Sequence, residues 1–251
     1  MKKILECAMD IGEQMLISGG EVHRVEDSLK RILSASGAAR IDVFIITSSM
    51  VVTIHTKDGD VLTQTRRITD TGIDFERLHL LNELSRKICR TEMTAEQIQK
   101  ELRKIYLSKR YPFWAECVCY AVIAGVFTLF FGGGFIEAAV SAGTGLLVRF
   151  LVILSDRIVK NKIFTKFIAS LIATALAFAA SGLNIIPDPH NVIIGSIMAL
   201  LPGIGLTNAL RDLFVGDSIA GLLRTIEACI TALSIAAGYF VIALIAGGAG
   251  A

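Results

Sequence analysis

Residues 201–217 read LPGIGLTNALRDLFVGD, and Arg224 and Glu227 follow closely. This stretch places a proline, two neighbouring glycines, an asparagine and several charged side chains inside or beside apolar runs that are long enough to span a bilayer. Irregular backbone and charge at membrane depth cost free energy, and they persist mainly where they line a cavity or find partners. The stretch is therefore the first candidate for a functional site.

The composition divides the chain into two parts of different character. Of its 251 residues 53% are hydrophobic, yet residues 1–110 hold 18 of the 25 Lys and Arg and 16 of the 23 Asp and Glu. This contrast predicts an α+β domain of ordinary polarity over residues 1–110 and an all-α membrane domain over residues 111–251. The net charge of +2 does not favour a polyanion, so nucleic acid is not an expected partner.

Two helices are predicted at the start of the chain. Apolar side chains recur at helical spacing over residues 4–16 and again over residues 22–33. Ser18-Gly19-Gly20 separates the two segments, and a break this short predicts a helical hairpin.

A change of period then predicts strands. Residues 41–67 are rich in β-branched side chains and contain the turn signal Asp58-Gly59, which indicates a small antiparallel meander. Helical spacing returns over residues 75–88. A further helix is predicted to begin at Thr94, because Thr94 and Gln97 have the spacing of a capping box.

Five long apolar runs follow, and each has about the 20 residues that a transmembrane helix needs. They cover residues 112–131, 135–154, 163–183, 191–210 and 219–246. The predicted fold is thus an α+β cytoplasmic N-terminal domain followed by five transmembrane helices.

The distribution of basic residues predicts the orientation. No Lys or Arg occurs in the loops 132–134 and 184–190. By the positive-inside rule, the N-terminus is expected in the cytoplasm and the C-terminus outside a bacterial inner membrane. The start of the chain shows no secretory signal. The basic residues at or near the expected cytoplasmic ends are Lys109, Arg110, Arg149, Arg157, Lys160, Lys162, Lys166, Arg211 and Arg224.

Pro202 and two following glycines, Gly203 and Gly205, lie within the fourth run. Proline removes a backbone donor and clashes with the preceding turn, so the helix is expected to be discontinuous. A half-helix N-terminus and exposed carbonyl groups at such a break suit an anionic substrate group. An ordinary proline kink packed against neighbouring helices is the alternative, and the small residues Gly195, Ala199 and Gly203 form a face that favours helix packing.

Charged residues cluster beside this break. Arg224 and Glu227 are three positions apart on the fifth helix, and Arg211, Asp212 and Asp217 are predicted to lie in the short cytoplasmic loop before it. A cationic group there can recognise a substrate carboxylate, and Glu227 can carry a coupling proton. The alternative is mutual neutralisation, with Arg224 paired to Glu227 or Asp217. The candidates for the substrate or ion path are Pro202, Gly203, Gly205, Asn208, Arg211, Asp212, Asp217, Arg224 and Glu227.

Secondary candidates lie in both parts of the chain. Glu116 and Glu137 are single charges near the ends of the first two apolar runs, where snorkelling to the interface accounts for them. Arg149 is deeper and is expected to need a partner. Acidic residues at the start of the second helix favour its dipole. The secondary candidates are Glu21, Arg24, Glu26 and Arg149.

The sequence gives little support for metal binding, for a cofactor or for an enzymatic activity. The five cysteines show no CxxC spacing and are interpreted as small reduced hydrophobic residues. Neither a nucleophile–base pair nor metal-ligand spacing occurs in the N-terminal part, so no metal or cofactor and no enzymatic activity are expected.

Several segments together resemble the threonine/serine exporter family. They are Gly19-Gly20-Glu21-Val22-His23-Arg24-Val25-Glu26, the predicted strand pair from Val43 to Thr56, Thr65-Arg66-Arg67, Arg211-Asp212-Leu213 and Gly216-Asp217. The resemblance extends over essentially the whole chain. It is greatest to the larger split subunit of the bacterial succinate-exporter type.

The resemblance implies export of a small metabolite driven by the proton gradient. Fused family members carry a further membrane segment, which is not expected after Gly247-Gly248-Ala249-Gly250-Ala251. A small four-span partner subunit is therefore expected, and assembly into an oligomer is compatible with it. The predicted function is a membrane subunit of a secondary exporter for a threonine/serine-type amino acid or a dicarboxylate such as succinate. The alternative is a membrane-anchored regulatory or interaction subunit without its own transport path.

Overall fold

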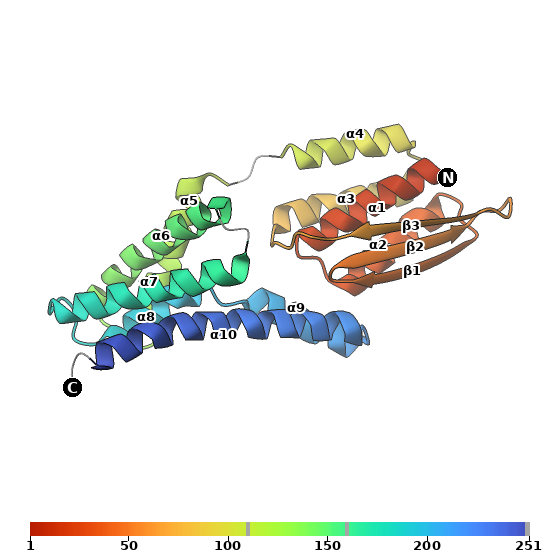
Figure 1. Ribbon diagram of the computed structural model, residues 1–251. Helices are drawn as coiled ribbons and strands as arrows, with labels where there is room; N and C mark the ends of the chain where they lie inside the picture. Colours follow the sequence, from red (N-terminus) through yellow and green to blue (C-terminus); the bar gives the residue numbers. More distant parts are fainter. Residues whose placement is uncertain (109–110, 159–160, 249–251) are drawn as a thin grey trace. The chain divides into compact units, whose positions relative to one another are not determined.

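The computed structural model describes residues 1–108, 111–158 and 161–248 (Figure 1). Within these ranges the chain forms two compact units, one from residues 1–108 with 204–225 and the other from residues 111–203 with 226–248. Among the basic residues used to predict the orientation, Lys109, Arg110, Lys160 and the side chain of Arg157 lie outside the described residues. The tail from residue 249 to residue 251 lies outside them as well.

The N-terminal part of the first unit has the predicted α+β order. Two helices precede a three-stranded antiparallel sheet with strand order β1-β2-β3, and two further helices follow it. The elements are α1 (Lys2–Ile17), α2 (Val22–Ala35), β1 (Arg40–Ile46), β2 (Ser49–His55), β3 (Val61–Arg67), α3 (Phe75–Arg90) and α4 (Ala95–Tyr106).

Two local features predicted from the sequence, the Asp58-Gly59 turn and the capping box at Thr94, are found in the structure. Gly59 adopts a φ of 90° between β2 and β3, a conformation that glycine reaches without steric cost. At the start of α4, Thr94 accepts a hydrogen bond from the Gln97 backbone N–H, and the Gln97 side chain accepts one from the Thr94 backbone N–H. This reciprocal pair is the predicted capping box.

The core of this unit lies between the helices and one face of the sheet. Alternate residues of β2, Met50, Val52 and Ile54, are fully buried, as expected for a strand with one covered face. They pack with apolar residues of α1, α2, α3 and α4. The same core includes Ala220, from the first turns of α10 (Ser218–Gly248), so this distant segment is part of the unit.

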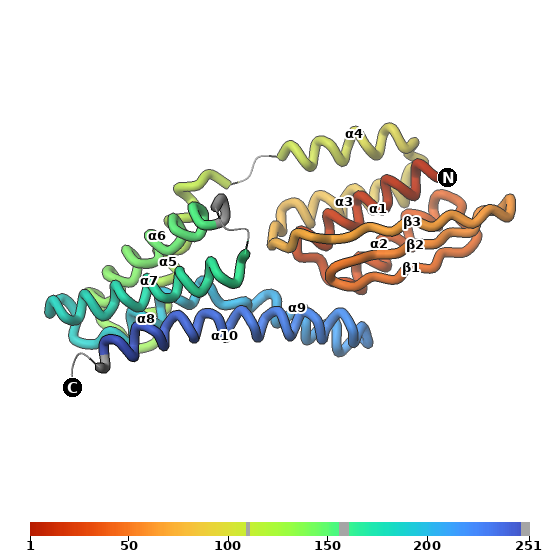
Figure 2. The backbone as a smooth tube through the Cα atoms, viewed as in Figure 1, coloured from red at the N-terminus to blue at the C-terminus, as the bar shows by residue number. Residues whose placement is uncertain are grey.

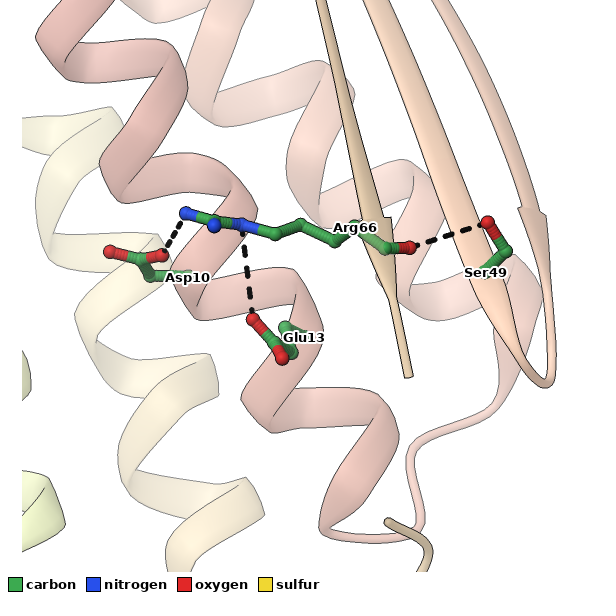
Figure 3. A network of polar contacts seen from close by, with 4 residues as sticks. All are labelled: Asp10, Glu13, Ser49 and Arg66. Atoms are coloured by element: carbon green, nitrogen blue, oxygen red, sulfur yellow. Dashed lines mark hydrogen bonds and ion pairs between the residues drawn. The ribbon is translucent and has the colours of Figure 1, made fainter. Parts of the chain in front are cut away.

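A polar network connects α1 to the edge strand β3 (Figure 3). Arg66 donates to Asp10 at 2.7 Å, and its Nε lies 3.9 Å from a carboxylate oxygen of Glu13. On the neighbouring strand β2, the Ser49 hydroxyl donates to the Arg66 carbonyl oxygen at 3.3 Å. Burial raises the pKa of Asp10 above its usual value, although the nearby Arg66 acts in the opposite direction.

Apolar helices make up the second unit (Figure 2). Its elements are α5 (Phe113–Phe130), α6 (Phe135–Ile158), α7 (Lys162–Gly182), α8 (Pro189–Met198) and the part of α10 from residue 226 onward. The described residues include four helices that are long and apolar enough to cross a membrane. A fifth span arises if α8 and α9 (Gly203–Val215) are counted as one bent helix.

Glycines let the helices of the second unit approach closely. A Cβ on Gly145 of α6 would lie 2.7 Å from the Tyr120 carbonyl oxygen of α5, and a Cβ on Gly195 of α8 would lie 2.6 Å from the Ala124 carbonyl oxygen. Ser141 of α6 donates to this same Ala124 oxygen at 3.1 Å. Small residues and hydroxyl groups therefore hold α5, α6 and α8 together, as they commonly do in membrane helix bundles.

Candidate functional site

The apolar helix that carries the Pro-Gly pair is broken at Pro202. Helix α8 ends at Met198, α9 begins at Gly203, and the two form a pair bent by 57°. In the break, the Leu201 N–H donates to the Met198 carbonyl at 3.3 Å and the Gly203 N–H donates to the Leu201 carbonyl at 2.9 Å. These short-range bonds replace the regular helical ladder, which Pro202 cannot continue because it has no N–H.

Gly203 and Gly205 lie in the first turn of α9. Apart from the adjacent residues and the backbone of α9 itself, no heavy atom of the described residues lies within 4 Å of the position that a Cβ would take at either residue. The packing role that the small residues suggested is therefore found at Gly195 but not at Gly203. Gly203 and Gly205 leave the first turn of α9 without side chains at these two positions.

A glycine turn between α1 and α2 is the part of the first unit that side chains of α9 and α10 bind. Gly19 has a φ of 91°, which favours glycine, and a Cβ on Gly20 would lie only 2.7 Å from the Met15 carbonyl oxygen. Glu21 is the N-cap of α2, but its side chain makes no capping hydrogen bond. The Gly19–Glu21 turn thus keeps two carbonyl groups and one carboxylate available for residues outside the hairpin.

Three of the predicted path residues bind this turn, all within the first unit. Asn208 donates from its side chain to the Gly19 carbonyl oxygen at 3.2 Å. Arg224 donates to the Gly20 carbonyl oxygen at 2.7 Å, and Arg211 donates to the Glu21 carboxylate at 2.8 Å. Residues about 200 positions apart in the sequence are therefore brought together, and the secondary candidate Glu21 joins the same site.

A buried ion pair lies beside these contacts. The side chain of Asp212 is 1% exposed, and its carboxylate lies 3.5 Å from Nε of Arg224, whose side chain is 13% exposed. In the described part of the chain, Oδ2 of Asp212 has no hydrogen-bond partner, so the ion pair lacks full hydrogen-bond geometry.

The loop placement predicted for Arg211 and Asp212 is wrong, because both lie in the last turns of α9, which continues to Val215. Only Asp217 lies in the turn before α10, where its backbone N–H donates to the Asp212 carbonyl at 2.9 Å. Its Oδ2 is buried and, among the described residues, has no hydrogen-bond partner.

One interpretation of the sequence is that Arg224 forms an ion pair with Glu227 or Asp217. In the structure its carboxylate partner is Asp212, and Glu227 is exposed on α10. A helical i,i+3 spacing places Arg224 and Glu227 on neighbouring positions of one helix, but it does not oblige them to pair. The tertiary partner was missed because Asp212 was predicted to lie in a loop.

The other secondary candidates have separate surroundings. Arg24 lines a cavity of about 140 Å³ with Gly19, Gly20, Glu21 and Asn208, so it adjoins the site. Glu26 forms an i,i+4 ion pair with Lys30 at 2.5 Å on the surface of α2. The sequence predicts that the acidic residues at the start of α2 interact with the helix dipole. In the structure their side chains form ion pairs, Glu21 with Arg211 and Glu26 with Lys30.

Arg149 belongs to the second unit and has the partner that its depth predicts. Its guanidinium group donates to the Glu116 carboxylate from Nε at 3.1 Å, and it lies 5.2 Å from the centre of the Tyr120 ring. Ion pairing replaces the snorkelling interpretation for Glu116. Glu137 is 5% exposed and accepts a hydrogen bond from the Gly134 backbone N–H at 2.6 Å, so it caps the start of α6 and does not snorkel.

The site can bind carboxylates and exchange protons, but it offers no arrangement for metal binding. Within the described residues, no three His, Cys, Asp or Glu side chains are close enough together to hold a metal ion. The first unit contributes two arginines, an asparagine and a buried carboxylate. These are groups that recognise charge and hydrogen-bond donors, as in a solute-binding site.

Comparison with known proteins gives the same family over most of the chain. Two bacterial proteins named "Probable succinate transporter subunit YjjP" are similar. The one from Escherichia coli is 26% identical over 246 residues, covering 94% of this chain and 92% of that protein. The one from Klebsiella aerogenes is 26% identical over 245 residues, covering 93% and 89%.

A longer relative is also similar. The Mycobacterium tuberculosis protein named "Probable threonine/serine exporter" is 25% identical over 244 residues, which cover 96% of this chain and 46% of that protein. No solved structure matches. The family model described as "Putative threonine/serine exporter" matches residues 6–246, which include both units and every candidate of the path. The chain is therefore a multi-pass membrane protein and belongs to the threonine/serine exporter family.

Proposed function

We propose that this chain is the membrane subunit of a secondary exporter that moves a small carboxylate-bearing metabolite out of the cell. The substrate class is a threonine/serine-type amino acid or a dicarboxylate such as succinate, which are the solutes in the names of the similar proteins. Family membership supports transport and not enzyme chemistry. Proton coupling is part of the proposal, since a buried carboxylate is available to bind a proton.

The proposed topology follows the positive-inside rule. Residues 1–110 form a cytoplasmic domain and residues 111–251 form the membrane domain, with the N-terminus in the cytoplasm and the C-terminus outside. Lys162 and Lys166, at the start of α7, belong to the expected cytoplasmic end of that span. In this arrangement the Gly19–Glu21 turn meets α9 at the cytoplasmic mouth of the path.

One observation carries the proposal: a helix break at Pro202 is followed within α9 by the buried Asp212, which is paired with Arg224. A membrane anchor needs neither feature. A broken helix places backbone groups where a solute can bind them, and an arginine beside a buried acid can exchange that acid for a substrate carboxylate. Protonation of Asp212 would release Arg224 for this exchange.

A separate small partner subunit completes the proposed exporter. The name of the similar bacterial proteins includes the word subunit, and this supports a transporter assembled from more than one chain. We propose a four-span partner. Without it, the chain is expected to insert in the membrane but to transport slowly or not at all.

Efflux from metabolite-loaded cells tests the function. We expect export of threonine, serine or succinate when the chain is expressed with a four-span partner subunit, and little export with either alone. If no carboxylate is exported by the pair, the exporter proposal is wrong. In that case the regulatory-subunit alternative becomes the better account.

The role of Arg224 needs a variant that does not leave a buried charge behind. Asp212→Asn combined with Arg224→Gln removes both charges together and leaves polar, uncharged side chains at both positions. We expect normal membrane abundance and loss of export. The exposed Arg103 on α4, changed to Gln, is the matched control and should export normally. Wild-type export by the double variant would show that the ion pair has no part in transport.

A further inference from the structure

A groove on the N-terminal part of the first unit carries a strong positive charge. It runs over the seam between α2 and α3, has a volume of about 380 Å³, and shares Arg24 and Asn82 with the lining of the cavity at the Gly19–Glu21 turn. We call it the α2–α3 groove. Its lining residues are Arg24, Asp27, Ser28, Arg31, Asn82, Ser85, Arg86, Cys89 and Arg90.

Helical spacing on both elements builds the groove. On α2, Arg24, Ser28 and Arg31 repeat at intervals of four and three residues, so they follow one edge of the helix. On α3, Asn82, Arg86 and Arg90 repeat at intervals of four along the facing edge. The apolar faces beneath them belong to the core, which holds the two polar edges in place.

Most of this positive charge is not neutralised within the groove. Four arginines and one aspartate line it, an excess of three positive charges. Arg31 pairs with Asp27 at 2.9 Å, and Arg86 donates to the Asn82 carbonyl oxygen at 3.4 Å. In the described part of the chain, the guanidinium groups of Arg24 and Arg90 have neither a hydrogen bond nor an ion pair.

Basic residues continue on both sides of the groove. A recess next to it is lined by Arg86, Lys87 and Arg90 together with His79 and Glu83, and another by Lys30, Arg31 and Cys89. Glu83 is 3.4 Å from His79, and Lys87 is 3.8 Å from Glu101. The acidic neighbours are thus engaged on α3 and α4, outside the groove, and the groove itself keeps its excess of arginine.

We propose that the α2–α3 groove binds a phosphate-bearing anion with at least two negative charges. Guanidinium groups bind phosphate oxygens in pairs of parallel hydrogen bonds, and two unpaired arginines on opposite helices can hold two such groups. A zwitterionic amino acid has no net charge to match the excess in the groove. The proposed ligand is a phosphorylated metabolite or a phospholipid headgroup.

Binding of inorganic pyrophosphate to the purified full-length chain in detergent is the first test. Titration calorimetry near physiological ionic strength should give saturable binding. The variant Arg24→Gln/Arg90→Gln should bind about tenfold more weakly or worse, since each lost charge-assisted hydrogen bond removes a substantial part of the affinity. The matched control is Arg103→Gln, which removes a positive charge on α4 outside the groove and should bind like the wild type.

A second titration distinguishes the two sources of phosphate. Water-soluble short-chain phosphatidic acid, whose phosphomonoester headgroup can carry two negative charges, replaces pyrophosphate, and zwitterionic phosphatidylcholine of the same chain length is the comparison. Tighter arginine-dependent binding of phosphatidic acid assigns the groove to a membrane headgroup, and tighter binding of pyrophosphate assigns it to a soluble ligand.

Thermal unfolding confirms that each variant is folded, which is expected because the Arg24 and Arg90 side chains have no hydrogen bond or ion pair to lose within the described residues. The proposal is overturned if neither phosphate probe binds, or if Arg103→Gln weakens binding as much as the double variant does. These outcomes concern binding alone, so they are independent of any result on export.

Discussion

At the scale of single residues, the Gly19–Glu21 turn explains why two adjacent glycines precede α2. Gly19 needs its positive φ, Gly20 has no room for a Cβ, and the carbonyl groups of both accept hydrogen bonds from α9 and α10. A sequence pattern can locate such a turn, because Gly-Gly after a helical period is a strong stop signal. It cannot predict which distant side chain binds the exposed carbonyl groups.

Gly20→Ala should destabilise the first unit. The added methyl group would lie 2.7 Å from the Met15 carbonyl oxygen, a backbone atom that cannot move without distorting the end of α1. We expect a loss of about 1–3 kcal/mol, the usual cost of overpacking. Thermal unfolding of the purified chain measures it. Gly143→Ala is the control, because no atom lies within 4 Å of its Cβ position; equal losses in both variants would contradict the assignment.

Arg224→Gln alone should be much more destabilising than the change of both partners. It leaves the carboxylate of Asp212, which is 1% exposed, without its cationic partner. Removing one member of a buried ion pair typically costs about 3–5 kcal/mol. Adding Asp212→Asn should recover most of that loss, and denaturant unfolding of the single and double variants measures the recovery. No recovery would mean that Arg224 acts mainly through the Gly20 carbonyl.

At the scale of elements, much of the fold follows from patterns within the sequence. The capping box at Thr94, the Asp58-Gly59 turn, the three strands and the apolar helices are all found as predicted, because each depends on neighbours close in the chain. The break at Pro202 follows from proline itself. What local patterns do not contain are the contacts of α9 with the N-terminal hairpin, and these create the site.

The same distinction separates the right and wrong interpretations of single charges. Arg149 was expected to need a partner because of its depth, yet Glu116 was interpreted as snorkelling although it is that partner. Whether side chains of neighbouring membrane helices can pair depends on how each helix is rotated about its own axis. Depth along a span can be counted in the sequence, but rotation is decided by packing at residues such as Gly145.

Asp10, which connects α1 to β3 through Arg66, should make the stability of the folded state depend on pH in a predictable direction. Burial raises the pKa of Asp10, so the folded state favours the protonated carboxyl. Its contribution to stability is present below its unfolded pKa of about 4 and is lost as the pH rises through the higher folded pKa. The stability of the wild type relative to Asp10→Asn should therefore fall as the pH increases over this range.

Glu101 is the control for that measurement, because its effect on stability should change with pH in the opposite direction. The hydrogen bond from Lys104 lowers the pKa of Glu101, so its contribution is lost as the pH falls. Relative to Glu101→Gln, the wild type should gain stability with increasing pH. Thermal unfolding of both pairs over a pH series tests the two signs together, and parallel trends would contradict the assignment to Asp10.

At the scale of the whole molecule, the number of crossings depends on the α8–α9 pair. Four helices are long and apolar enough to cross by themselves, and the bent pair adds a fifth span only if it traverses the bilayer. A break of this kind also occurs in re-entrant segments, which return to the side from which they started. The two cases place the C-terminus on opposite sides of the membrane.

A reporter fused after Gly248 measures this directly. With the N-terminus in the cytoplasm, five crossings put the reporter outside, so alkaline phosphatase should be active and a green fluorescent protein dark. A single cysteine at Leu183, in the turn after α7, should react with a membrane-impermeant maleimide added to intact cells once the native cysteines are replaced. A single cysteine at Ser108 should react only after lysis.

The two assays together separate orientation from crossing number. Labelling at Leu183 with an inactive phosphatase would mean that α8 and α9 form a re-entrant hairpin and that the chain crosses four times. That result would contradict the contacts of Arg211 and Arg224 with the Gly19–Glu21 turn, because it would place these arginines and the turn on opposite sides of the membrane. Labelling at Ser108 in intact cells would instead reverse the orientation. The proposed cytoplasmic mouth requires labelling at Leu183 and an active phosphatase, because only five crossings from a cytoplasmic N-terminus give both.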